Sequence, residues 1–151
     1  MTPWLHIVGI GEDGLDGLTP ATRAVVEAAE VIIGGDRHHG LSDIVKAERI
    51  SWPHPFDALI DQLRALAGRR VVVLATGDPL WFSVGARIGR AIDPQEITFH
   101  PQLSAFQLAA ARMGWLLLAS CGDDKLIKVW STIDRRLQYT LKKHDNWVRH
   151  C

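Results

Sequence analysis

The feature that most constrains the fold of this chain is the apolar run at residues 71–74 (VVVL), which leads into residues 75–79 (ATGDP). Three of the four residues in the run are β-branched, a pattern typical of a strand buried on both faces. Such a strand belongs to a parallel sheet covered by helices, and ligands bind these sheets beyond the carboxyl ends of the strands. Residues 76–79 are therefore expected to form a ligand-binding edge, with an ordinary strand-to-helix turn as the alternative.

Strand and helix patterns alternate about five times before residue 115. Apolar runs predict strands at residues 4–11, 31–33 and 71–75, and two further short strands are assigned at residues 49–51 and 96–99. Helical spacing of apolar residues predicts helices at residues 21–30, 41–45, 56–67, 81–91 and 104–113. Thr19 and Pro20 suit the cap and the first position of the first helix. This rhythm predicts an α/β fold, a mostly parallel sheet with helices on both faces.

Composition excludes several classes of protein. The 151 residues carry 17 basic and 17 acidic side chains, so no net charge draws the chain to nucleic acid or to an anionic membrane surface. No apolar run approaches the roughly 20 residues that span a bilayer, and the N-terminus lacks a signal-peptide pattern, so a cytoplasmic protein is expected. Cys121 and Cys151 lie outside any CxxC pattern, and the spacing of His144, His150 and Cys151 fits no structural zinc site. Neither a disulfide framework nor a metal site is expected.

The composition changes abruptly near residue 115. All seven prolines precede it, whereas four of the five lysines follow it. The first 114 residues hold ten basic and thirteen acidic side chains, and the remainder holds seven and four. Such a shift is typical of a boundary between segments of different character. We place it at residues 114–116, which divides the chain into residues 1–115 and 116–151.

Glycine turns close three of the predicted strands. The first strand ends in Gly9 and Gly11, the second is followed by Gly34 and Gly35, and Gly77 follows the strand at residues 71–75. Glycine-rich turns of this kind also occur in dinucleotide-binding proteins, but the acidic loop at residues 12–16 would repel a pyrophosphate. A cofactor with a positive centre would tolerate that loop, so NAD is not the preferred ligand.

Four motifs resemble one known family. They are residues 7–19 (IVGIGEDGLDGLT), 31–38 (VIIGGDRH), 74–85 (LATGDPLWFSVG) and 104–115 (SAFQLAAARMGW). In this order and spacing they resemble the N-terminal part of the precorrin-6Y methyltransferases of cobalamin biosynthesis, which belong to the tetrapyrrole methylases. The resemblance implies a two-domain α/β enzyme that binds S-adenosylmethionine between its domains and methylates a ring carbon of a tetrapyrrole substrate.

The resemblance also implies a set of cofactor-binding residues. The loop after the strand at residues 71–75 would hold the methionine part of the cofactor, with a tryptophan packing on it. A second contact would follow the last strand of the sheet. The residues at these positions are Thr76, Gly77, Asp78, Trp81, Ser104 and Ala105.

Other residues are assigned to the substrate and to proton transfer. By the same resemblance Gly9 and Gly11 line the substrate side of the cleft, and Asp36 matches an aspartate that accepts a proton. A helix cap is the alternative role of Asp36. His38 and His39 either steer substrate carboxylates or are exposed polar loop residues. No metal is implied, because a sulfonium methyl group is already activated and positioning supplies most of the help.

Residues 116–151 resemble a single WD-repeat blade instead. Strands are predicted at residues 116–120, 126–130 and 137–141, forming an antiparallel β-meander, with Asp124, Trp130 and His144 at the positions that share hydrogen bonds in WD repeats. One blade cannot close a propeller. The segment would pack on the methylase-like part, pair with a second copy through its strand edges to give a homodimer or oligomer, or stay partly disordered. The basic residues Lys142, Lys143 and Arg149 are interpreted as a solvated loop.

Two origins explain such a combination, a natural fusion and a chimera of unrelated fragments, and we favour the chimera. Three functions follow. The chain is an S-adenosylmethionine-dependent tetrapyrrole methyltransferase, impaired because the second domain is missing; a non-catalytic chimera selected for folding; or an interaction module that self-associates through its edge strands. Activity as a free-standing enzyme is not expected, because an open site neither excludes water nor orients a substrate.

Overall fold

The computed structural model describes residues 3–81, 83–114, 117–121, 127–131, 133 and 136–141. The chain divides into two compact units, Met1–Ser104 and Ala105–Cys151, and each is described on its own. Among the described residues, no helix is long and apolar enough to cross a membrane.

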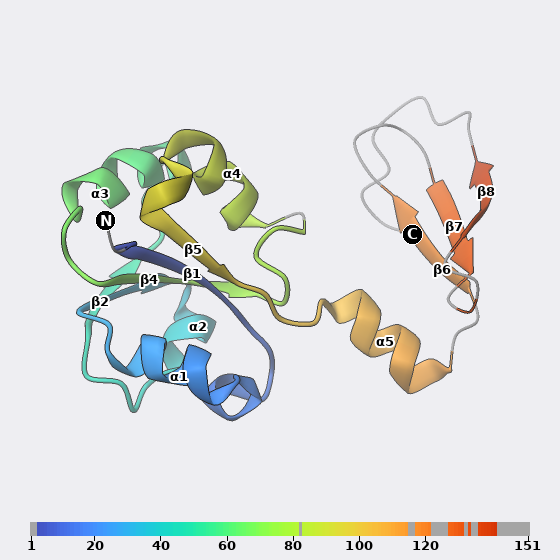
Figure 1. Ribbon diagram of the computed structural model, residues 1–151, viewed down its shortest axis with the longest axis horizontal. Helices are drawn as coiled ribbons and strands as arrows, with labels where there is room; N and C mark the ends of the chain where they lie inside the picture. The colour runs from blue at the N-terminus through green and yellow to red at the C-terminus, as the bar shows by residue number, and fades with distance from the viewer. Residues whose placement is uncertain are drawn as a thin grey trace. The chain divides into compact units, whose positions relative to one another are not determined.

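The first unit is built on a five-stranded sheet in the order β3-β2-β4-β1-β5 (Figure 1). Every pairing in it is parallel. The strands are β1 (Leu5–Ile10), β2 (Val31–Gly34), β3 (Glu48–Ser51), β4 (Val71–Thr76) and β5 (Ile97–His100). The predicted parallel sheet is therefore confirmed, and the run at residues 71–74 lies in its central strand.

Helices cover both faces of this sheet, as predicted: α1 and α2 on one face, α3 and α4 on the other (Figure 1). Their bounds are α1 (Pro20–Glu27), α2 (Asp36–Leu41), α3 (Leu59–Ala65) and α4 (Val84–Ala91), with 3₁₀ turns at Gly14–Gly17, Phe56–Ala58 and Pro94–Glu96. The start of α1 is the one predicted, because Thr19 Oγ1 accepts a hydrogen bond of 3.2 Å from the Thr22 N–H.

Strand β4 supplies both halves of the hydrophobic core. Val73 points to one face, where it packs in a cluster with Leu63 of α3 and Ile88 of α4. Leu74, the next residue, points to the other face and packs in a second cluster with Val26 of α1. All five side chains are fully buried. The alternation of side chains along a strand explains why an unbroken apolar run, rather than an alternating one, is needed at this position.

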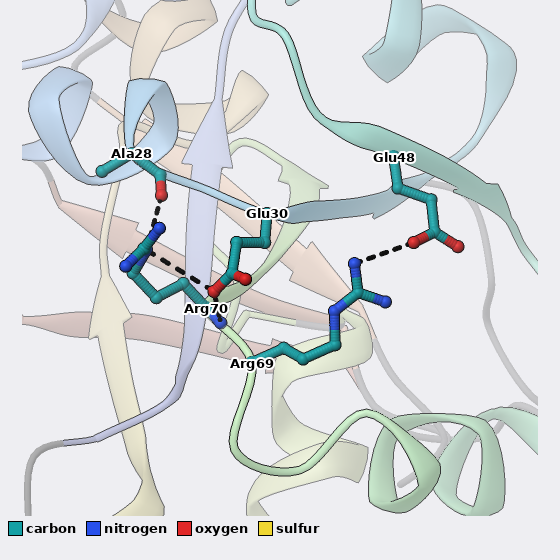
Figure 2. A network of polar contacts seen from close by, with 5 residues as sticks. All are labelled: Ala28, Glu30, Glu48, Arg69 and Arg70. Atoms are coloured by element: carbon teal, nitrogen blue, oxygen red, sulfur yellow. Dashed lines mark hydrogen bonds and ion pairs between the residues drawn. The ribbon is translucent and has the colours of Figure 1, made fainter.

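A polar network ties together the amino ends of three neighbouring strands (Figure 2). Arg70 Nε donates to the Ala28 carbonyl at 2.9 Å, and the Arg70 N–H donates to Glu30 Oε2 at 3.0 Å. Arg69 forms an ion pair of 2.8 Å with Glu48 at the start of β3. The pKa of the Glu30 carboxyl lies below its usual range, first because of the Arg70 N–H and then because of the Arg70 and Arg69 charges. These contacts fix the edge of the sheet opposite the carboxyl ends.

The short helix predicted at residues 41–45 is wrong. The helix in this region is α2, which begins earlier, at Asp36, and ends at Leu41. Ser42 Oγ donates back to the His38 carbonyl at 2.9 Å, a local bond that competes with helix continuation. Arg49 of β3 donates to the Ser42 and Val45 carbonyls, which also accept the backbone N–H groups of Val45 and Ala47 in short turns. Short backbone turns, supported by the Arg49 side chain, therefore replace the expected helix after Leu41.

The second unit contains α5 (Ala105–Met113) and a separate three-stranded sheet in the order β6-β7-β8. Its strands are β6 (Leu117–Cys121), β7 (Ile127–Ser131) and β8 (Leu137–Leu141), and both pairings are antiparallel, as the meander prediction requires. Trp130 lies in β7. The remaining residues named for the tail, Asp124, His144, Lys142, Lys143, Arg149, His150 and Cys151, lie outside the described residues.

Replacement of a core residue of β2 tests this account of stability. Ile33→Ala is expected to lower the free energy of unfolding by about 2–5 kcal/mol, because Ile33 is fully buried and its truncation leaves a cavity. Ile44→Ala is the matched control, since Ile44 is 68% exposed, and its effect is expected to stay within about 0.5 kcal/mol. Urea denaturation followed by circular dichroism measures both. Equal effects of the two substitutions would contradict the assigned core.

Candidate functional site

The order of the strands marks one edge of the sheet as a ligand site. β1 and β4 are neighbours, but their connections diverge: the chain leaves β1 through α1 toward β2, and leaves β4 through α4 toward β5. The helices α1 and α4 lie on opposite faces (Figure 1). In open parallel sheets this point of divergence, at the carboxyl ends of the strands, is where ligands bind. It lies where the sequence predicts a ligand edge.

The carboxyl ends of β1 and β4 approach each other closely. A Cβ atom at Gly9 would lie 2.0 Å from the Gly77 carbonyl oxygen and 2.8 Å from Gln102 Cβ, so only glycine fits there. The Gly77 N–H donates to the Ile10 carbonyl at 3.1 Å. A Cβ at Gly11 would meet no atom within 4 Å. The structure therefore brings together Gly9, Gly11 and Gly77, and it leaves open space beside Gly11.

Thr76, the last residue of β4, joins a polar network with α2. His38 Nε2 lies 3.0 Å from Thr76 Oγ1, and Arg37 Nη1 lies 3.5 Å from the same oxygen. Arg37 also forms an ion pair with Glu12, which follows β1. The Thr76 residue itself remains exposed. Three carboxyl ends of the sheet, those of β1, β2 and β4, thus contribute side chains to one network.

Asp78 and Trp81 lie in the turn between β4 and α4. Asp78 Oδ1 accepts a hydrogen bond of 2.9 Å from the Leu80 N–H, and the Asp78 carbonyl accepts one of 3.3 Å from the Trp81 N–H. Asp78 is half-buried, whereas the Trp81 side chain is 53% exposed. The helix predicted at residues 81–91 begins later than expected, at Val84, as α4. The turn therefore presents a carboxylate and an aromatic surface at the same edge.

Asp36 is the first residue of α2 and is exposed. Gly35 occupies the cap position, so Asp36 is not the helix cap that the alternative required. The Gly35 N–H donates instead to His38 Nδ1 at 3.2 Å. Asp36 is left as an exposed carboxylate directly after β2, at the same edge of the sheet as Thr76.

The interpretation of His38 and His39 as exposed loop residues is wrong, because both belong to α2 and are half-buried. Both ring nitrogens of His39 are buried and have no hydrogen-bond partner among the described residues. They do not face solvent, so His39 is not placed to steer a substrate carboxylate. Burial, followed by the Arg37 and His39 charges, lowers the pKa of His38 and keeps its ring neutral.

A second histidine contact was not predicted from the sequence. His6 of β1 and His100 of β5 lie with Nδ1 and Nε2 3.1 Å apart. Burial lowers the pKa of both rings, and the charge of His100 lowers that of His6 further. The two residues are far apart in the sequence, and only the pairing of β1 with β5 brings them together. No local sequence signal could have indicated this contact.

Ser104 and Ala105 stand at the division between the two units. Ser104 is half-buried and is the last residue of the first unit, and Ala105 is exposed and begins α5. These two residues are therefore described apart from the other candidates, and their cofactor role stays a prediction.

Comparison with known proteins now identifies the family. The family model described as Tetrapyrrole (Corrin/Porphyrin) Methylases matches residues 4–146. This chain belongs to the tetrapyrrole methylase family. A solved relative, uroporphyrin-III-C-methyltransferase from Thermus thermophilus, superposes with a TM-score of 0.62 at 28% sequence identity. The superposition covers 83% of this chain and 57% of the chain of that relative. A precorrin-6Y methylase from Archaeoglobus fulgidus shares the fold, with a TM-score of 0.55 at 19% identity over 97% of this chain and 94% of its own.

Curated relatives of this chain act on precorrins, according to their names. Precorrin-6Y C(5,15)-methyltransferase [decarboxylating] of Sinorhizobium sp is 40% identical over 118 residues, which are 78% of this chain and 29% of the relative. Cobalt-precorrin-7 C(5)-methyltransferase of Salmonella typhimurium is 31% identical over 110 residues, 73% of this chain and 55% of the relative. The chain thus spans less than two thirds of the length of either relative.

The family match extends past the predicted boundary at residue 115. The matched residues 4–146 include most of residues 116–151. Precorrin-3B C(17)-methyltransferase of Sinorhizobium sp is 30% identical in an alignment of 154 positions that covers 91% of this chain. These matches give no support to a WD-repeat blade or to a chimera. Both interpretations, and the boundary between residues 1–115 and 116–151, stay predictions.

The close approach of β1 and β4 can be tested with a matched pair of substitutions. Gly9→Ala is expected to lower the free energy of unfolding by about 1–3 kcal/mol or more, because the added methyl group would overlap the Gly77 carbonyl. Gly11→Ala adds the same methyl group to open space and is expected to leave stability nearly unchanged. Denaturant titration measures both variants. Comparable stability of the two would contradict the described geometry.

The histidines predict how stability depends on pH. The pKa values of His6, His38 and His100 are lowered in the folded chain, so below a pH of about 6.5 the unfolded chain binds more protons than the folded one. Stability is therefore expected to fall as the pH is lowered from 7.5 to 5.5. The denaturation midpoint at each pH measures this, and His6→Gln should flatten the dependence whereas His54→Gln, at an exposed position, should not. A midpoint that rises toward pH 5.5 would contradict the expectation.

Proposed function

We propose that this chain forms the α/β part of an S-adenosylmethionine-dependent methyltransferase that methylates a ring carbon of a precorrin. The observation that carries the proposal is the convergence of Gly9, Gly11 and the turn at residues 76–78 at the switch point of the sheet, in a chain of the tetrapyrrole methylase family.

The names of two relatives favour carbon 5 as the position that is methylated. The Sinorhizobium relative is named for carbons 5 and 15, and the shorter Salmonella relative for carbon 5 alone. Both align with a segment of similar length in this chain. The function that both names share is methylation at C5, so we assign C5 to the segment that they share with this chain.

The residues present fit the proposed cofactor. S-adenosylmethionine supplies a methyl group that is activated by a positively charged sulfur, and its amino acid part carries a carboxylate and an ammonium group. The exposed Thr76 hydroxyl can bind an acceptor oxygen, and the half-buried carboxylate of Asp78 can attract the ammonium group. The exposed Trp81 offers an apolar surface, and the absence of a side chain at Gly11 leaves room beside these groups. In this proposal Ser104 and Ala105 add the second contact.

Asp36 is proposed as the proton acceptor. A ring carbon that gains a methyl group must lose or relay a proton, and a carboxylate near the reacting carbon can accept it. Asp36 is exposed and follows β2, so it can pass the proton on to water. In this proposal Gly11, which faces open space, leaves room for the tetrapyrrole to approach, and Gly9 lets the turn after β4 pack closely against β1 on the same side of the cleft.

A second candidate is a non-catalytic chimera that self-associates. The separate antiparallel sheet β6-β7-β8 favours it, since its outer strands present edges and Leu137 and Tyr139 are exposed in β8. This candidate accounts for the sequence of residues 116–151 but not for the family match across them. It would take a second copy of the chain as its partner.

Substitution of two carboxylates tests cofactor binding and methyl transfer separately. Asp78→Asn is expected to weaken S-adenosylhomocysteine binding about tenfold or more, since bonds to charged groups contribute about 1.5–3 kcal/mol. Asp36→Asn is expected to leave that affinity within about twofold but to lower the rate of methyl transfer about a hundredfold or more. Calorimetric titration and transfer of a labelled methyl group to precorrin measure the two effects.

Asp43→Asn, at an exposed position outside the site, serves as the control. Saturable binding of one S-adenosylhomocysteine per wild-type chain supports the methyltransferase. Absence of binding at millimolar ligand contradicts it and favours the non-catalytic chimera.

A further inference from the structure

We propose that His38 is a positioning residue that fixes the Thr76 hydroxyl as a hydrogen-bond donor toward a carboxylate of the ligand. The inference rests on the proposed function, because the ligand in question is the amino acid part of the cofactor. It assigns a role to a histidine that the resemblance left between substrate steering and an exposed loop.

The hydrogen bonds of His38 determine which ring nitrogen carries the proton. The Gly35 backbone N–H can only donate, so His38 Nδ1, 3.2 Å away, must accept with its lone pair. The neutral ring then carries its proton on Nε2, which lies 3.0 Å from Thr76 Oγ1. Nε2–H therefore donates and the Thr76 oxygen accepts. The backbone at the start of α2 in this way sets the direction of a hydrogen bond at the end of β4.

The same oxygen has a second donor nearby. Arg37 Nη1 lies 3.5 Å from Thr76 Oγ1, and Arg37 is held in place by its ion pair with Glu12. A hydroxyl group has two acceptor lone pairs and one proton. With both lone pairs facing donors from α2, the remaining capacity of Thr76 is to donate its proton. An exposed hydroxyl that can only donate selects a ligand atom that only accepts, such as a carboxylate oxygen.

The His38 ring is held tightly enough to perform this role. A Cβ atom at Gly34 would lie 2.9 Å from His38 Cβ and 3.2 Å from Nδ1, so the ring occupies the space that a side chain there would need. Trp52 packs edge-on against the ring, with centroids 6.4 Å apart and planes at 90°. The ring is thus enclosed by β2, by the Trp52 side chain and by its own helix, and only Nε2 points to Thr76.

Two substitutions of His38 separate the two bonds of its ring. Asn places an amide oxygen near the position of Nδ1, so His38→Asn keeps an acceptor for Gly35 but loses the donor to Thr76. Gln places an amide nitrogen near the position of Nε2, so His38→Gln keeps the donor to Thr76. His38→Asn is expected to weaken S-adenosylhomocysteine binding about three- to tenfold, and His38→Gln is expected to stay within about twofold of wild type.

Thr76→Val tests whether His38 acts through Thr76. It is expected to weaken S-adenosylhomocysteine binding by the same three- to tenfold as His38→Asn, and the double variant is expected to bind no more weakly than either single variant. Binding of methylthioadenosine, which lacks the amino acid part, is expected to be unchanged in all variants. Additive effects, or equal losses for both ligands, would overturn the inference.

A readout without ligand keeps the inference separate from the proposed function. Nitrogen-15 NMR of the full-length chain is expected to show His38 protonated on Nε2 and not on Nδ1, with the Nε2 resonance shifted by Thr76→Val. A proton on Nδ1 would overturn the inference whatever the chain binds. If the wild-type chain binds no S-adenosylhomocysteine, the proposed cofactor is wrong. The role of His38 in binding that cofactor is then wrong as well, even if the ring is protonated on Nε2 as expected.

Discussion

Burial of β4 on both faces holds the first unit together, because its alternate side chains enter two separate hydrophobic clusters. Val73 belongs to the cluster under α3 and α4, and Leu74 belongs to the cluster under α1. Each helical layer depends on the same strand, so the two layers cannot form independently. Because the side chains of this strand are apolar on both faces, polar groups that can bind a ligand occur only at its ends, where backbone groups are unpaired.

The amino ends of the strands carry stabilising polar contacts, whereas the carboxyl ends form the proposed binding site. At the amino ends Arg69 and Arg70 bind Glu30, Glu48 and a backbone carbonyl, and this network is formed within the chain (Figure 2). At the carboxyl ends the contacts are incomplete: Thr76 is exposed and Gly11 faces open space. A sheet edge that satisfies its own polar groups has little to offer a ligand, whereas one that keeps donors and space exposed can bind it.

Much of the candidate site follows from local sequence signals. The turn after residues 71–75 and the glycines at the end of the first strand are predicted from the sequence, because a buried strand that ends in glycine is a local pattern. The partners of these residues were not predicted. His38 was left between two roles, and its contact with Thr76 crosses from α2 to β4, which no periodicity encodes. The helix predicted at residues 41–45 failed for a more local reason, because the backbone after Leu41 forms short turns that Arg49 of β3 stabilises by donating to the Ser42 and Val45 carbonyls.

The sequence by itself determined the elements and their layers: five short strands alternating with helices, a helix start at Thr19, and the motifs of the tetrapyrrole methylases. Those features depend on neighbours within about one helical turn or a few strand residues, which the sequence states directly. Only the tertiary structure decided that β1 lies between β4 and β5. That order creates the approach of Gly9 to Gly77 and of His6 to His100, since contacts between distant residues depend on which strands are neighbours.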